Sequence, residues 1–130
     1  MNRPILLLSV LVLILIGCAR IQVPTEMPKV DRAFEAAAQY EFGDSREPLM
    51  AVKDQIRASY GNPAERRYVL QKMTAFLDSD ASFQARQFMC KQLAVVGTAQ
   101  ETPALADMLD DPETSDMARY ALERIAAPQA

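Results

Sequence analysis

The fold of this chain is decided by residues 76–90, which read FLDSDASFQARQFMC. The apolar run ends at Leu77, and Asp78, Ser79 and Asp80 follow as a short acidic turn. From Ser82 onward, apolar residues recur every three or four positions, which is the period of an amphipathic helix. The segment therefore predicts the end of one helix, a tight turn and the start of a second helix.

A weaker copy of this pattern follows at residues 108–122, which read MLDDPETSDMARYAL. Leu109 lies 32 positions after Leu77, and Arg119 lies 33 positions after Arg86, so the second turn holds one extra residue. A period slightly above thirty, with two helices in each unit, is typical of helical solenoids.

Helical periodicity also covers the rest of the chain from Val30 onward. Four helices are expected, over residues 30–42, 48–60, 63–77 and 82–96. A short fifth helix follows a capping pattern at Thr98 and Glu101, and a sixth helix ends before Pro128. Asn62, Pro63 and Glu65 form a strong start signal for the third helix, in which Glu65 completes a capping box. The same period places Phe42, Tyr60 and Leu109 on apolar faces, and Gly97 is expected to cap the fourth helix. The predicted fold class is all-α, a short α-solenoid of about three stacked hairpins.

Residues 62–126 resemble HEAT repeats of the short bacterial type. In both copies the first helix ends in Leu-Asp, the turn is acidic and the second helix opens with Ala-Arg. Gly97-Thr98 followed by Thr102-Pro103-Ala104-Leu105 is similar to the linker between repeats of that family. Residues 30–61 join only by pattern, as a divergent first repeat.

The resemblance implies that four charged residues are repeat framework, tying each turn to the helix that follows. They are Asp78, Arg86, Asp110 and Arg119. The alternative interpretation is that the two arginines bind an acidic partner.

The N-terminus resembles the leader of bacterial lipoproteins. Arg3 precedes the apolar run Ile5–Ile16, whose 12 residues span roughly 18 Å as a helix, short of the hydrocarbon core of about 30 Å. Leu15-Ile16-Gly17-Cys18 is similar to the lipobox of that class. The resemblance implies cleavage between Gly17 and Cys18 and lipid attachment to Cys18, and several acyl chains anchor a protein stably.

Three regions are therefore expected: a signal peptide at 1–17, a lipidated cysteine with an extended tether at 18–29, and a helical repeat domain at 30–130. Ala19 follows the cysteine, and by resemblance to known sorting rules this favours the periplasmic face of the outer membrane.

The composition excludes several function classes. The 14 basic and 17 acidic residues are interspersed, so the basic patch expected of a nucleic-acid binder is missing. The chain has no histidine, phosphate loop, GxSxG motif or dinucleotide fingerprint, so no catalytic residue and no cofactor are predicted. Cys90 lacks a histidine to activate it and is expected to be a small apolar residue, or else to form an intermolecular bridge.

An acidic cluster in the second copy raises the question of calcium. It consists of Asp107, Asp110, Asp111, Glu113 and Asp116. Calcium loops need a glycine at their sharp turn, and none follows Gly97. Helix capping explains these carboxylates without a metal, so no metal site is predicted.

The predicted function is a membrane-anchored scaffold that binds another protein, through a polar face formed by the second helices. The candidate contacts are Gln84, Gln87, Lys91, Arg119, Glu123 and Arg124. Three alternatives stay open: an accessory or regulatory subunit of an envelope enzyme, a lyase-like HEAT-repeat enzyme, and a shortened repeat protein that dimerises through an uncapped end.

Overall fold

The structure, a computed structural model, describes residues 27–126, and every regular element in that range is a helix. The elements are α1 (Met27–Ala37), α2 (Glu47–Ala58), α3 (Pro63–Leu77), α4 (Phe83–Val96), α5 (Thr102–Asp107), the 3₁₀ helix η1 (Met108–Asp110) and α6 (Ser115–Ala126). The predicted all-α class is thus confirmed for this part of the chain. The predicted leader, Cys18 and most of the tether lie outside the described residues.

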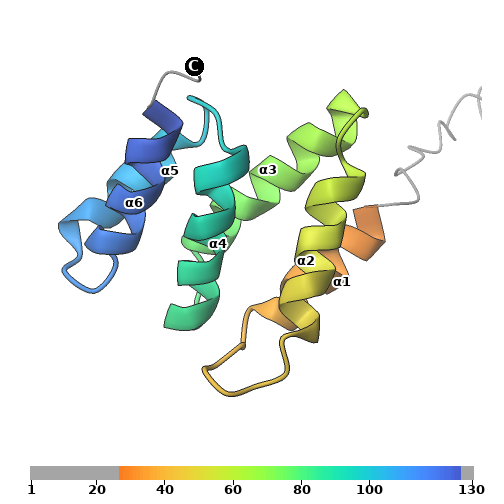
Figure 1. Cartoon of the computed structure of the whole chain (residues 1–130), viewed down its shortest axis with the longest axis horizontal. Coiled ribbons are helices and arrows are strands. Elements are labelled where there is room, and N and C mark those ends of the chain that lie inside the picture. The colour runs from red at the N-terminus through yellow and green to blue at the C-terminus, as the bar shows by residue number, and fades with distance from the viewer. Residues whose placement is uncertain (1–26, 127–130) are drawn as a thin grey trace, which may run out of the picture.

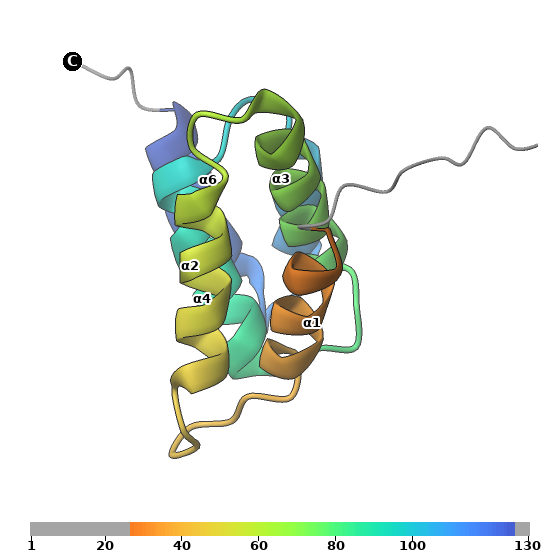
Figure 2. The same cartoon turned by 90° about the vertical axis from the view of Figure 1, so that its right-hand side faces the viewer.

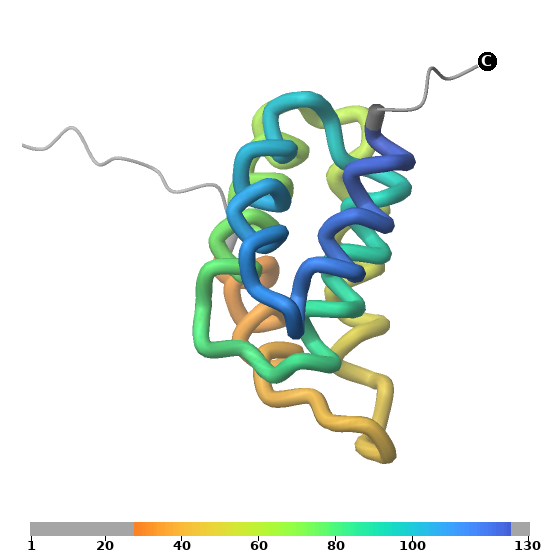
Figure 3. The backbone as a smooth tube through the Cα atoms, turned by 90° about the vertical axis from the view of Figure 1, so that its left-hand side faces the viewer, coloured from red at the N-terminus to blue at the C-terminus, as the bar shows by residue number. Residues whose placement is uncertain are grey.

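The helices form two rows of three (Figure 1). Consecutive helices pair as the hairpins α1–α2, α3–α4 and α5–α6. The second helices α2, α4 and α6 lie side by side in one row, and α1, α3 and α5 lie in the other (Figure 2). Seen from the opposite end, the α5–α6 hairpin closes the described chain in front of α3 and α4 (Figure 3).

The core lies between the two rows, because each helix has one apolar stripe and turns it toward the opposite row. Its largest fully buried apolar side chains are Val52, Val69, Met73, Met89, Leu93 and Leu105. Phe34 and Phe76 meet edge to face with ring centroids 6.0 Å apart, which joins α1 to α3.

Side-chain caps define where α3 and α4 begin. The Asn62 carboxamide oxygen accepts hydrogen bonds from the backbone N–H groups of Ala64 and Glu65, as the start signal predicts. The Asn62 N–H donates to the Ser59 carbonyl, so the Glu65 side chain does not complete a capping box. At α4, the Ser82 hydroxyl oxygen accepts from the Ala85 N–H.

The first helix differs from its prediction at both ends. It begins at Met27, so Pro28 lies in the first turn, where its missing N–H leaves no hydrogen bond unmade. It ends at Ala37, where the Tyr40 N–H donates to the Ala37 carbonyl, three residues back, instead of to the carbonyl four residues back that a continued α-helix would use. The Ala38 carbonyl accepts the Ser82 N–H at 2.8 Å, which directs the chain beyond the helix. Phe42, predicted to face the core, is therefore in the α1–α2 loop and 90% exposed.

Two more residues expected on apolar faces are outside the core. Tyr60 lies beyond the end of α2 and is 59% exposed, and Leu109 lies in η1 and is 41% exposed. Both fall where the regular α-helix has ended, so the helical period no longer directs their side chains inward.

Gly97, predicted as a helix cap, is needed for space and not for an unusual backbone angle. Its φ of −66° suits any residue. A Cβ at this position would lie 2.6 Å from the Leu93 carbonyl oxygen and 2.7 Å from the Ile125 Cδ1. The missing side chain therefore lets α6 pack closely against the end of α4.

A polar contact ties α1 to α3 across their shared row. The Asp31 carboxylate accepts a hydrogen bond from the Tyr68 hydroxyl at 2.7 Å and pairs with the Lys72 ammonium at 2.7 Å. The hydrogen bond from Lys72, followed by that from Tyr68, lowers the pKa of Asp31 below its ordinary value of 3.8.

We expect Asp31→Asn to lower the free energy of unfolding by about 0.5 kcal/mol at pH 7, a small value because the Asp31–Lys72 pair is about one-third exposed. A carboxyl whose pKa is lowered by folding stabilises the protein above its unfolded value and loses this effect as the pH falls through the folded value. The difference between wild type and variant should therefore shrink progressively in urea titrations as the pH falls below 3.8 and through the lowered pKa of the folded state. The control is Asp54→Asn, which removes the more exposed pair with Arg57; an equal effect would contradict the prediction.

Candidate functional site

The six predicted contact residues lie on two neighbouring helices. Gln84, Gln87 and Lys91 belong to α4, and Arg119, Glu123 and Arg124 belong to α6. Both helices are in the row of second helices, so the structure brings the six residues onto one layer of the molecule (Figure 1).

The two arginines on α6 are occupied by contacts within their own helix, whereas Glu123 is exposed. Arg119 pairs with the Asp116 carboxylate one turn earlier. The Arg124 guanidinium stacks 3.6 Å from the centre of the Tyr120 ring and donates to the Tyr120 carbonyl. Such contacts hold these cations close to the helix surface and reduce what they offer to a partner.

The three candidate residues on α4 lack such contacts. Within the described range, no hydrogen bond or ion pair engages the side chains of Gln84, Gln87 or Lys91. They share one helix face with Phe88, because positions three, four and seven residues apart line up along an α-helix. The opposite face of α4 is packed into the core through Ala85, Met89 and Leu93, among others.

A hollow of about 330 Å³ runs along one side of this α4 face, and we call it the loop groove. Its lining comes from the α1–α2 loop, α2 and α4: Tyr40, Phe42, Arg46, Leu49, Gln84, Gln87, Phe88 and Lys91. It combines aromatic rings with amides and two cations, a composition suited to noncovalent binding.

A second hollow, of about 200 Å³, lies on the other side of the same face, between α4 and α6. Gln87 and Lys91 line both hollows, so they form a ridge between the two. Met117 and Tyr120 line the α6 side of the second hollow, which gives it an apolar wall.

The sequence interpretation missed the contribution of the α1–α2 loop to this site. Tyr40, Phe42 and Arg46 reach the loop groove because α1 ends early. The signal was present as Gly43-Asp44-Ser45, a cluster of turn-forming residues directly after Phe42.

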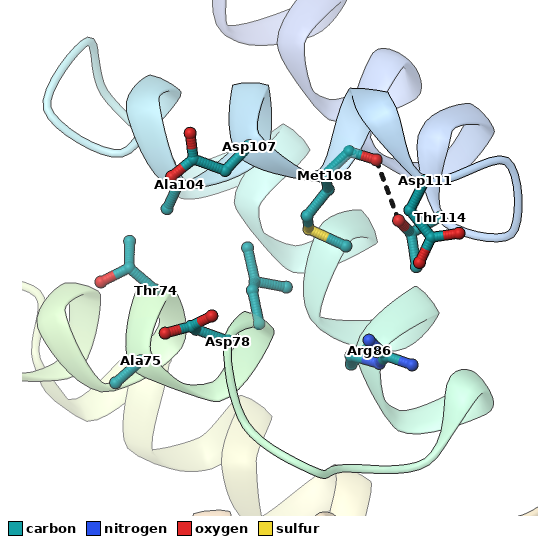
Figure 4. A pocket seen from close by; sticks show the side chains of 10 residues that line it. Thr74, Ala75, Asp78, Arg86, Ala104, Asp107, Met108, Asp111 and Thr114 are labelled. Carbon is teal, nitrogen blue, oxygen red and sulfur yellow. Dashed lines mark hydrogen bonds between the residues drawn. The ribbon is translucent and has the colours of Figure 1, made fainter.

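The largest hollow, of about 500 Å³, lies where α3 and the start of α4 face α5 and η1, and we call it the acidic hollow. Three carboxylates line it, those of Asp78, Asp107 and Asp111, together with Arg86 (Figure 4). The Thr114 hydroxyl on its edge donates to the Met108 carbonyl at 2.9 Å.

The framework residues do not form the pairs that the repeat resemblance implies. Within the described residues no ion pair joins Asp78 to Arg86, and the Arg86 Nε is buried without a hydrogen-bond partner. Arg119 pairs with Asp116 and not with Asp110. The turns are held by hydroxyl and backbone hydrogen bonds instead, such as that from the Ser79 hydroxyl to the Phe76 carbonyl.

The acidic cluster of the second copy is dispersed. Across residues 27–126, no group of three or more potential ligand side chains is gathered closely enough to hold a metal ion. The Asp111 carboxylate accepts from the Glu113 N–H at 2.9 Å, and Asp116 lies in the first turn of α6, where a negative charge complements the helix dipole.

Cys90 forms part of the wall of the second hollow, but none of its side-chain surface is exposed. Burial raises the pKa of its thiol to about 12, despite the opposing influence of Arg86. The neutral thiol packs as a small apolar group.

We expect Cys90 to react slowly with a disulfide reagent while the protein is folded. A thiol of pKa about 12 holds roughly a thousandfold less thiolate at pH 8 than one at the ordinary 9.0. The measurement uses the Cys18→Ala variant, in which Cys90 is the remaining one of the 2 cysteines. Labelling should follow the unfolding curve in guanidinium, and fast labelling in native buffer would contradict the assignment.

None of the described helices has the length and apolar character needed to cross a membrane. No family model, curated protein or solved structure matches this chain.

Proposed function

We propose that this protein is a lipid-anchored lipoprotein of the bacterial envelope that binds another protein on the outer face of its second helices. The single observation that carries the binding role is the outward face of α4. There Gln87 and Lys91 stand between two hollows and Gln84 lines the loop groove, and none of the three has a partner in the described chain. Polar side chains on a helix that have no partner within the chain are available to hydrogen-bond with another protein.

The arrangement of the helices supports a short α-solenoid of HEAT-like hairpins. Each hairpin packs against the next, and first and second helices keep to separate rows. In such architectures a row of helices presents a continuous surface, which suits the binding of an extended partner.

The anchoring role rests on the leader sequence. The apolar run Ile5–Ile16 followed by Gly17-Cys18 supports cleavage before Cys18 and lipidation of its sulfur. With residues 19–26 as a tether, the helical domain would work close to the membrane, on the periplasmic face of the outer membrane.

We expect Cys18→Ala to abolish incorporation of a labelled fatty acid and to move the protein out of the membrane fraction. Both effects follow because the acyl chains supply the membrane affinity. Cys90→Ala is the matched control and should keep the label. Membrane attachment that persists in Cys18→Ala without the label would contradict lipid anchoring.

The binding role is tested by placing a photo-crosslinking amino acid at position 87 of the full chain in bacteria. We expect a discrete adduct with one partner protein, since Gln87 lies on the ridge between the two hollows. The matched control is position 71, an exposed glutamine on α3 in the opposite row. Adducts at both positions alike, or at neither, would refute the proposal, and an adduct of twice the chain's mass would identify the partner as a second copy.

A further inference from the structure

The α1–α2 loop, residues 38–46, is held in place by hydrogen bonds at its start and within it. Ser82 donates its N–H to the Ala38 carbonyl at 2.8 Å and its hydroxyl to the Tyr40 carbonyl. Further along, the Glu41 N–H donates to the Asp44 carboxylate at 3.0 Å, and the Asp44 N–H donates to the Glu41 carbonyl at 3.1 Å. The loop is therefore ordered before any partner arrives.

This ordered loop presents a large aromatic side chain to solvent. Phe42 is 90% exposed, and it is the most exposed of the large apolar side chains in the described chain. Gly43 next to it has a φ of +101°, which turns the chain sharply after the phenylalanine. An exposed aromatic ring on a fixed loop, beside a groove, is the kind of residue that dominates binding energy in protein interfaces.

The charges of the loop groove have one sign. Arg46 and Lys91 are its charged lining residues, and no carboxylate lines it. The whole chain has a net charge of −3, so the charge of the groove lining is opposite in sign to the net charge of the chain. The acidic hollow on the other side of α4 has the opposite balance, with Asp78, Asp107 and Asp111 against Arg86.

The side-chain amides of the groove offer hydrogen bonds to a bound molecule. Gln84 and Gln87 each offer a carbonyl acceptor and an NH₂ donor. A peptide in extended conformation carries unpaired backbone N–H and C=O groups that need such partners when they are taken out of water. The groove thus offers aromatic rings to an apolar side chain, cations to carboxylates and amides to a peptide main chain. Together these groups define one type of occupant.

We infer that the loop groove binds an extended, acidic peptide segment of the partner protein. One apolar side chain of the segment packs against Phe42 and Phe88, and flanking carboxylates pair with Arg46 and Lys91. This inference rests on the proposed binding function and adds the chemistry of the bound segment. The acidic hollow repels such a segment, so binding is confined to the outer face of the second helices.

The test is selection of a random heptapeptide display library on the full lipidated chain in nanodiscs. We expect enriched peptides to combine two or more carboxylates with one aromatic or large aliphatic residue. Enrichment of basic or uncharged peptides, or no enrichment at all, would overturn the inference. If the peptide selection fails in one of these ways while position 87 still crosslinks to a partner in cells, the inference about the acidic segment is wrong and the proposed binding function stands.

Variants then assign the selected peptide to the groove by fluorescence anisotropy. The double variant Arg46→Glu, Lys91→Glu should bind the selected peptide at least about tenfold more weakly. The same variant should bind tightly to a second peptide in which lysines replace the carboxylates. Phe42→Ala should weaken it roughly tenfold without changing the melting temperature, because the ring is exposed in the free protein. The control Lys53→Glu changes an exposed α2 lysine outside the groove and should leave binding unchanged; equal losses in the control would refute the assignment.

Discussion

Ser82 joins three parts of the molecule at one residue. Its hydroxyl oxygen accepts the Ala85 N–H and so begins α4, while the same hydroxyl donates to the Tyr40 carbonyl. Its own N–H donates to the Ala38 carbonyl, just beyond the end of α1. A hydroxyl can be donor and acceptor at once, so one small side chain fixes the start of one helix and the path of the loop that follows another. The exposed position of Phe42 and the shape of the loop groove both depend on this contact.

The two-row packing explains why α4 has a free face and α6 does not offer an equivalent one. Both helices bury one stripe against the opposite row. On α6 the outward cations are engaged by Asp116 and Tyr120 of the same helix. On α4 the outward positions hold two glutamines, which have no such partner one turn away, and a lysine. Gln84, Gln87 and Lys91 therefore lie beside the loop groove without a partner in the described part of the chain.

The two copies of the sequence pattern match in position but not in contacts. Arg86 is half-buried and lines the acidic hollow, where α5 and η1 lie across from it. Arg119 is exposed, because no described helix lies beyond α6 to cover it, and it pairs with Asp116. A side chain's surroundings depend on the element next in the stack, so equal sequence signals give different environments.

The sequence by itself determined the helical class, most of the helix limits and much of the core, because periodicity and caps such as Asn62 are local signals. It also predicted the residues of the α4 face, since these follow from the same period. Only the tertiary structure decided the path of the chain after α1, since the hydrogen bonds to the carbonyls of Ala38 and Tyr40 come from Ser82, more than forty positions along the chain. Phe42 keeps the helical spacing with Phe34 and Ala38, while Gly43-Asp44-Ser45 directly after it is a turn signal, so the two local rules disagree about its place. Its exposure, and with it the loop groove, exists because folding brings a distant serine to the carbonyls of Ala38 and Tyr40.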